Sequence, residues 1–259
     1  YTTLFRSDAQ AFILGMTPEK WNKINNDPRH PMQNRFKGIF APGSSLKPII
    51  AAIGLSQNKF SASDDFGNSG KRWQKNKSWG GYYVTTLHDY SGHNVRNALI
   101  YSDNIYFAKA ALKIGKDTLK DQFDNLLFGK NLDFTFGLTA SSYGSEGFTS
   151  EIQLADSGYG QGEMMVNPVH MATIYTAFSN KGNMLKPYLI KQKGSKKQVL
   201  KEHVFSNDAV KTVNDAMKQV ISNPNGTGHA AQIDGIDLKG KTGTAEIKQS
   251  QTDTKGTEL

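Results

Sequence analysis

The stretch from Pro42 to Leu55 constrains this chain more than any other, because a turn runs there directly into an apolar helix. Its Pro-Gly pair predicts the turn. Pro48 is compatible with the first turn of a helix but not with its middle, so the helix begins close to Ser44. The apolar run from Ile49 to Leu55 has to be covered by other parts of the chain. The sequence therefore predicts a buried helix with Ser44 at its entrance.

Ser44 and Lys47 carry reactive groups at this entrance. With about 100° of turn per residue, a hydroxyl and an amine three residues apart lie on one face of a helix. Free backbone N–H groups in the first turn favour developing negative charge, which suits acyl transfer by a serine nucleophile and a lysine base. The same spacing recurs at Ser56 and Lys59, in a stretch that reads as a solvated loop. The pair alone therefore also fits a capped core helix with a surface lysine.

Composition limits the class of protein. With 259 residues and 37% apolar content, the chain can form one large domain or two small ones. Its 31 basic and 23 acidic residues give a net charge of +8, which favours anionic surroundings. The lysines are spread along the chain without a zinc-finger or RNA-binding motif, so no nucleic acid is predicted as a partner.

Cysteine is absent, which excludes disulfides and thiolate metal sites. The six histidines are far apart and show no metal-ligand spacing, so we predict no metal site. His229 follows a Thr-Gly pair and has two interpretations, a residue of a cleft or a histidine of a surface loop. The longest apolar run, around Leu46 to Leu55, is too short to span a bilayer.

Capping residues, prolines and apolar periodicity predict a chain with many helices. A short helix runs from Thr17 to Ile24. The other predicted helices run from Val95 to Ile100, from Asn104 to Ile114, from Asp117 to Gly129, from Ser150 to Ala155, from Pro168 to Gly182 and from Ser206 to Val220.

Strand signals are few. Tyr82–Val84 reads as part of a short hairpin, and Tyr188–Ile190 as a strand of a second, basic hairpin that turns at Gly194. The one strong strand is Ile236–Glu246, where apolar residues alternate before a Lys-Thr-Gly sequence. An isolated strand has nothing to pair with, so the sheet that contains it is incomplete or needs further segments.

Two loops have unusual composition. The loop from Ser61 to Gly81 carries Trp73 and Trp79, which form either a ligand platform or anchors that pin the loop to the core. The segment from Asp156 to Gly162 has too many glycines for a helix or a strand. We expect positive φ angles or a close approach of backbone segments there.

Three short motifs stand in order along the chain, and together they are specific. They are Ser44-x-x-Lys47, Ser102-Asp103-Asn104 and Lys241-Thr242-Gly243. This set is typical of penicillin-binding proteins and class A β-lactamases. On these motifs the chain resembles the transpeptidase domain of class B penicillin-binding proteins, in particular the low-affinity Gram-positive group linked to β-lactam resistance. The segments that support the narrower resemblance are Phe40–Ser44, Trp73–Gly81, Leu154–Glu163 and Lys241–Glu246.

The resemblance implies an α/β (α+β) fold of the β-lactamase/transpeptidase type, with an antiparallel sheet flanked by helices plus an all-helical subdomain. The whole chain, residues 1–259, would be one transpeptidase domain, with the helical subdomain at about residues 56–182. Such domains have strands before the first motif and after the third. We therefore expect this chain to be a fragment truncated at both ends, with an N-terminal membrane anchor absent.

The resemblance also implies catalytic roles. Ser44 is the nucleophile, and Lys47 takes its proton, which a lysine can do only when it is neutral. Burial and the positive charge of Lys241 would both lower the pKa of Lys47. Ser102 relays a proton to the leaving nitrogen, and Asn104 orients Lys47 and the backbone of the substrate.

Thr242, Gly243 and Thr244 are implied as substrate-binding residues, and the two threonines hold the substrate carboxylate together with Lys241. The backbone N–H groups of Ser44 and Thr244 would form the oxyanion hole, where each donor contributes about 3 to 4 kcal/mol in known cases. The implied reaction is attack of Ser44 on the D-Ala-D-Ala end of a peptidoglycan stem peptide, followed by acyl transfer to a neighbouring stem-peptide amine. β-Lactam antibiotics would acylate the same serine.

The resemblance implies no cofactor, and it places the domain on the extracytoplasmic face of the cell membrane. The main alternative is a serine β-lactamase or β-lactam sensor of the same fold. Glu163, four residues before Asn167, superficially matches the deacylating carboxylate of class A β-lactamases. It follows Gly-Tyr-Gly-Gln-Gly and precedes the helix-starting Pro168, so a structural role is the better interpretation. A second alternative, a non-catalytic cell-wall binding module, would not need the three motifs together.

Overall fold

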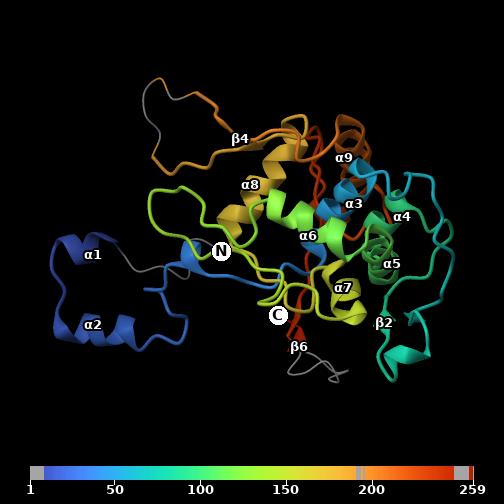
Figure 1. The fold of residues 1–259 in the computed structure, drawn as a ribbon. Coiled ribbons are helices and arrows are strands. Elements are labelled where there is room, and N and C mark those ends of the chain that lie inside the picture. The colour runs from blue at the N-terminus through green and yellow to red at the C-terminus, as the bar shows by residue number, and fades with distance from the viewer. Residues whose placement is uncertain (1–8, 191–193, 195, 248–256, 259) are drawn as a thin grey trace. The chain divides into compact units, whose positions relative to one another are not determined.

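The computed structural model describes residues 9–190, 194, 196–247, 257 and 258 of the chain (Figure 1). The chain divides into two compact units, Tyr1–Gly38 and Ile39–Leu259. The second unit contains all of the motif residues. No helix within the described ranges is long and apolar enough to cross a membrane.

The first unit is small and helical. Its elements are α1 (Ala9–Ile13), α2 (Pro18–Asn25) and the 3-10 turn η1 (Arg35–Lys37). Thr17 accepts a hydrogen bond from the Lys20 N–H at the start of α2, which confirms the helix predicted there. α2 buries none of its residues, and the described residues of the apolar core all come from the second unit.

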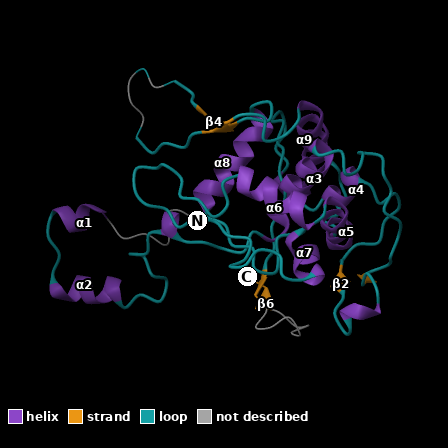
Figure 2. Ribbon diagram, in the orientation of Figure 1, coloured by secondary structure: helices purple, strands orange, loops and turns teal. Residues whose placement is uncertain are grey.

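The second unit is organised around the helix that the sequence predicts after Ser44. Leu46, Ile49, Ile50 and Ile53 are fully buried, and this helix packs against two later helices, α5 (Asn104–Ile114) and α9 (Asn207–Ser222). The helices of the unit are α3 (Lys47–Ser56), α4 (Val95–Ile100), α5 (Asn104–Ile114), α6 (Lys116–Asn125), α7 (Glu151–Ser157), α8 (Pro168–Ser179) and α9 (Asn207–Ser222). Three 3-10 turns accompany them: η2 (Gly43–Leu46), η3 (Lys77–Trp79) and η4 (His229–Ala231). Figure 2 shows that helices and loops dominate the second unit.

Side-chain caps begin several of these helices, as the sequence predicts. Asn94, Ser150 and Ser206 each accept a hydrogen bond from a backbone N–H in the first turn of α4, α7 and α9. α6 departs from the prediction, because it begins directly after Gly115, whose φ is 87°. Asp117 therefore lies inside the first turn of α6 and does not cap it. The helix also ends earlier than predicted, at Asn125.

The strands are short and pair in antiparallel fashion. β1 (Arg72–Trp73) pairs with β2 (Val84–Thr85), β3 (Met184–Leu185) with β4 (Val199–Lys201), and β5 (Glu246–Ile247) with β6 (Thr257–Glu258). The first pair confirms the short hairpin predicted at Tyr82–Val84. The second confirms a hairpin but corrects its strands, because exposed residues 188–190 form no strand and the pairing lies further from the tip. Gly194 is described, whereas residues 191–193 and 195 of the predicted tip lie outside the described residues.

The strongest predicted strand, Ile236–Glu246, is wrong for all but its last residue, Glu246, which begins β5. Residues 236–245 form no strand, and Ile236 remains 55% exposed. An alternating pattern becomes a strand only where a neighbour supplies the ladder of hydrogen bonds. None of the described residues pairs with 236–245. The described sheets are therefore limited to the three short pairs and two isolated bridges, Phe40 with Val166 and Ser142 with Met165.

Candidate active site

Ser44 lies in the 3-10 turn η2, and Lys47 is the first residue of α3. With three residues per turn, a 3-10 turn aligns residues i and i+3 along one edge. Gly43 starts this turn with φ of +52° and donates its N–H to the Gly160 carbonyl at 3.0 Å. The predicted entrance of the helix is therefore present, as a 3-10 turn that leads into the α-helix.

Lys47 is completely buried, although its amine is an ionisable group. Its Nζ donates to the Ser102 carbonyl at 2.6 Å, to Ser102 Oγ at 3.1 Å and to Asn104 Oδ1 at 2.6 Å. Burial and the positive charge of Lys241 lower the pKa of Lys47 well below its usual value, and Asp103 opposes this shift. Such an amine is neutral more often than an exposed lysine and can accept a proton.

Lys241, in another segment of the chain, also contacts Ser102. Its Nζ donates to Ser102 Oγ at 2.8 Å, and to the carbonyl and Oγ1 of Thr242 at 3.0 Å each. Burial lowers the pKa of Lys241 to about 7. Two amines with lowered pKa values thus meet at the Ser102 hydroxyl, which can pass a proton between them and a bound substrate.

Ser102 adopts an unusual backbone conformation between α4 and α5. Its φ is +55°, in the left-handed region that costs a non-glycine residue about 1–2 kcal/mol. Asp103 follows it and caps α5 by accepting the Ile105 N–H at 2.8 Å. This conformation directs the Ser102 hydroxyl to Lys47 and Lys241. The arrangement of these three side chains therefore depends on a strained backbone at Ser102.

A cavity of about 490 Å³ opens beside these groups. Five of the predicted residues line it, namely Ser44, Ser102, Asn104, Thr242 and Thr244. Lys47 and Lys241 are not among its lining residues, but both donate to the Oγ of Ser102, which is one of them. Gly243 packs against Ser45 near the same wall. The structure thus brings the three motifs together. Within the described residues, however, the hydrogen bonds of Lys47 go to Ser102 and Asn104 and not to Ser44.

The cavity has further lining residues that sequence reasoning missed. They include Tyr83, Thr85, Tyr101, Tyr159, Gln161 and Thr227. Thr227 is tied to the third motif, because Thr242 Oγ1 donates to Thr227 Oγ1 at 2.9 Å. Its N–H donates to the carbonyl of Ile100 at 3.1 Å. In the sequence Thr227 lies inside a cluster of turn residues, where nothing in its spacing distinguishes it from an ordinary loop threonine.

The glycine-rich segment from Asp156 to Gly162 holds the turn η2, in which Ser44 lies. Gly160 and Gly162 have φ angles of +77° and +71°, as the composition of this segment predicts. Tyr82 donates to Asp156 Oδ2 at 2.6 Å, and Tyr159 donates to the same carboxylate. These bonds hold the segment while the Gly160 carbonyl accepts the Gly43 N–H.

Three side chains that the sequence leaves with two interpretations lie away from the reacting groups. Trp79 is 5% exposed and packs edge-on against Trp73 at 5.4 Å, which supports anchors that pin the loop. His229 contacts the Ile221 carbonyl at 3.0 Å and is absent from the lining of the cavity. Glu163 is exposed and also absent from that lining. In the described ranges no group of His, Cys, Asp and Glu side chains could hold a metal ion.

Comparison with known proteins gives a consistent result. The family described as "Penicillin binding protein transpeptidase domain" matches residues 8–259. Penicillin-binding protein 3 of Bacillus subtilis is 39% identical over 252 residues, which are 97% of this chain and 38% of that protein. Peptidoglycan D,D-transpeptidase FtsI of Escherichia coli K12 is 28% identical over 87% of this chain and 37% of its own length. The chain thus spans less than half of these relatives.

A solved structure shows the same architecture. The D,D-transpeptidase domain of a peptidoglycan glycosyltransferase from Eggerthella lenta has a TM-score of 0.73 and 25% identity, and covers 93% of this chain and 61% of its own. The likeness confirms the α/β fold class of the β-lactamase/transpeptidase type that the three motifs imply.

Proposed function

The chain belongs to the penicillin-binding protein transpeptidase domain family, and on this premise we propose that it is a peptidoglycan D,D-transpeptidase that works through a serine acyl-enzyme. The observation that supports the proposal most directly is that two lysines donate hydrogen bonds to one hydroxyl. Lys47, fully buried, and Lys241 both donate to Ser102 Oγ, beside a cavity that Ser44 lines. A binding module has no need of buried amines around a serine.

The first half-reaction forms the acyl-enzyme. Neutral Lys47 accepts the proton of Ser44 as Oγ forms a bond to the carbonyl carbon of the penultimate D-Ala. Negative charge develops on the carbonyl oxygen, which the backbone N–H groups of Ser44 and Thr244 stabilise. The Ser102 hydroxyl then gives its proton to the leaving nitrogen and is reprotonated by a neighbouring lysine, so the terminal D-Ala departs.

The second half-reaction transfers the acyl group. The amine of a neighbouring stem peptide attacks the ester carbon, and its proton passes through Ser102 to Lys47. Lys47 gives a proton to Ser44 Oγ as the ester C–O bond breaks, which releases Ser44. Lys241, Thr242 and Thr244 hold the carboxylate of the donor substrate, and Gly243 lies beside Ser45 of η2. Asn104 orients Lys47, because its Oδ1 accepts a hydrogen bond from Lys47 Nζ. The Asn104 amide also donates to the Thr85 carbonyl at 3.1 Å and so holds the β1–β2 hairpin.

Three finer proposals follow from the same resemblance. We place the chain with the low-affinity Gram-positive group linked to β-lactam resistance, which its similarity to a Bacillus subtilis penicillin-binding protein supports. We place its action on the extracytoplasmic face of the membrane, because peptidoglycan is cross-linked there, with tethering through an N-terminal anchor. Residues 56–182 would form the helical subdomain of a transpeptidase domain. A slow second-order acylation rate with penicillin would test the first of these proposals.

Incubation with a penicillin, followed by intact-mass spectrometry, tests the function itself. We expect an adduct with the full mass of the drug, because opening of the lactam ring releases no leaving group. The adduct should persist for hours and be absent from Ser44→Ala. Rapid hydrolysis of the drug without a lasting adduct would instead favour a β-lactamase. Absence of both reactions would reject the proposal.

Binding of the drug should also depend on pH through Lys241. Because burial lowers its pKa to about 7, Lys241 loses its positive charge as pH rises through that value, and its attraction for a carboxylate weakens. We expect the dissociation constant of a penicillin for Ser44→Ala, which cannot be acylated, to increase between about pH 6 and pH 9. A constant that stays flat over this range would show that Lys241 does not hold the carboxylate by charge.

A further inference from the structure

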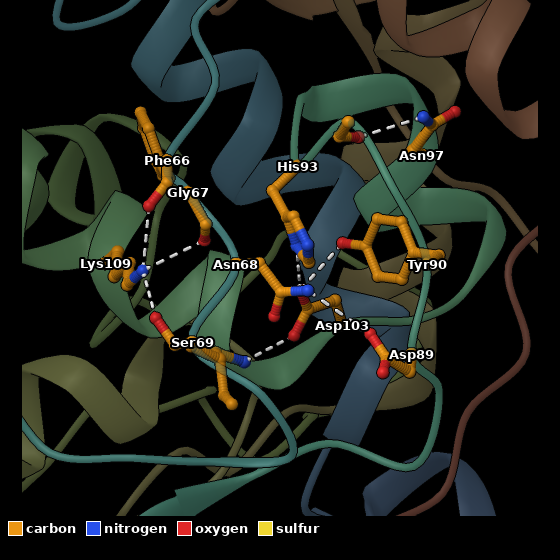
Figure 3. Close-up of polar contacts among 12 residues, drawn as sticks. Phe66, Gly67, Asn68, Ser69, Asp89, Tyr90, His93, Asn97, Asp103 and Lys109 are labelled. Atoms are coloured by element: carbon orange, nitrogen blue, oxygen red, sulfur yellow. Dashed lines mark hydrogen bonds and ion pairs between the residues drawn. The ribbon is translucent and has the colours of Figure 1, made fainter.

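Asp103, the middle residue of the second motif, has no role in the mechanism above, yet it lies at the centre of a polar cluster (Figure 3). Its side chain is 3% exposed. Oδ1 accepts the Ile105 N–H at 2.8 Å, and Oδ2 accepts the Tyr90 hydroxyl at 2.7 Å. His93 Nδ1 lies 3.6 Å from the same Oδ2. A buried carboxylate with this many partners has a fixed position.

Tyr90 holds both neighbours of Ser102. Its hydroxyl binds Asp103 on one side, and its ring stacks on Tyr101 on the other, with centroids 4.5 Å apart and planes at 18°. The Tyr90 ring also packs against His93, with ring centroids 4.4 Å apart. Burial raises the pKa of Tyr90, so its hydroxyl remains a donor throughout the working range of pH. The left-handed Ser102 is thus clamped at the residue before it and at the residue after it.

The charge of Asp103 also reaches Lys47. This charge raises the pKa of Lys47, against burial and Lys241, which both lower it. The other ionisable groups around Asp103 are Asp65, Tyr106 and Lys109, and Lys109 Nζ is bound to the Phe66 and Gly67 carbonyls and to Ser69 Oγ.

We propose that Asp103, clamped by Tyr90, is a positioning residue that keeps Ser102 in its left-handed conformation between Lys47 and Lys241 and places a negative charge near Lys47. The inference rests on the proposed function, since it concerns the rate of acylation at Ser44. It assigns Tyr90 and Asp103 an effect on chemistry, although neither lines the cavity.

Tyr90→Phe tests the clamp, because it removes the hydroxyl and keeps the stacked ring. We expect the rate of acylation by a saturating penicillin to fall about ten- to one-hundredfold, the effect expected when a hydrogen bond to a buried charged group is lost. The dissociation constant of the drug should not change. Tyr143→Phe is the matched control, because Tyr143 donates to Asp124 Oδ1 at 2.8 Å away from the cavity. It should leave the rate unchanged.

Asp103→Asn tests the charge, because asparagine still caps α5 and has the same size. The rate of acylation should rise with pH as Lys47 loses its proton and fall as Lys241 loses its own. In Asp103→Asn the rising limb should move to lower pH, because a negative charge that raises the pKa of Lys47 is gone. The falling limb should stay in place, since Asp103 does not affect the pKa of Lys241.

The outcomes separate the two proposals. Wild-type protein that forms no adduct at Ser44 would overturn the proposed function. Wild-type protein that is acylated, with Tyr90→Phe as fast as Tyr143→Phe, would overturn the positioning role alone. A rising limb of Asp103→Asn that stays fixed or moves to higher pH would also overturn it, because a merely structural aspartate would lower the plateau without moving either limb.

Discussion

Replacement of Lys47 by methionine is expected to slow acylation of Ser44 by about two to four orders of magnitude, the usual contribution of a general base. The reason is specific to the structure. Lys47 is the buried amine whose pKa is lowered by burial and by Lys241, so it is the group able to accept the serine proton at neutral pH. Methionine has an unbranched side chain of similar length, so it can occupy the space of the Lys47 side chain without supplying an amine. The measurement is the single-turnover rate of adduct formation with a penicillin.

The fold should survive this change. Methionine leaves the Ser102 carbonyl and Asn104 Oδ1 without their donor, at a cost of about 1–3 kcal/mol for each unpaired group. The loss is offset because an amine no longer has to be buried. Circular dichroism and urea unfolding should therefore report a folded protein, so that a lost rate reflects lost chemistry.

The chain supplies its own control for this experiment. Lys59 stands three residues after Ser56, with the spacing of the active pair, but the Ser56 Oγ accepts the backbone N–H of Ser206 outside the cavity. Lys59→Met should leave acylation at the wild-type rate. If Lys47→Met reacted as fast as Lys59→Met, the base would have to be another group, and the Ser-x-x-Lys spacing would have no catalytic meaning here.

Sequence reasoning predicted best where the signals are local. Helix α4 is bounded by its cap, Asn94, and α9 by Ser206 and an apolar period, and both lie where predicted. The predicted site residues also lie together. That proximity could not be worked out from spacing, because Ser44, Ser102 and Lys241 are far apart in the chain; it came from the family resemblance. Their catalytic roles stay predictions until the variants are measured.

What could not be predicted depends on long-range partners. Ile236–Glu246 has a strand pattern, but a strand exists only beside a neighbour, and the described residues provide none for 236–245. Thr227 and Tyr90 become relevant only through contacts with Thr242 and Asp103, which no local pattern encodes. The glycine-rich segment is an intermediate case, because its positive φ angles were predictable and its partner, Gly43, was not.

Gly160→Ala is expected to be among the most damaging glycine substitutions near the site. A Cβ at this position would lie 2.0 Å from the Gly43 carbonyl oxygen, and Gly160 has φ of +77°. The left-handed conformation alone costs alanine about 1–2 kcal/mol. Because the clash is with backbone, relief requires the two segments to separate, and the total loss should be about 3–5 kcal/mol out of a typical stability of about 5–15 kcal/mol.

The same separation should damage the chemistry. Movement of Gly43 breaks its hydrogen bond to the Gly160 carbonyl and displaces the next residue, Ser44, from the end of the cavity that it lines. A displacement of about 1 Å in a reacting group costs on the order of one hundredfold in rate. We therefore expect Gly160→Ala to lose both stability and acylation.

Gly129→Ala separates conformational strain from the clash. Gly129 has φ of +73°, close to that of Gly160, but nothing lies within 4 Å of the position of its missing Cβ. This variant should lose only about 1–2 kcal/mol in urea unfolding and be acylated at the wild-type rate. Equal losses of stability in the two variants would mean that the approach of Gly160 to Gly43 is not tight. The glycine-rich segment would then owe its composition to its φ angles alone. The entrance of α3 would have to be held by the hydrogen bonds of Tyr82 and Tyr159 to Asp156 instead.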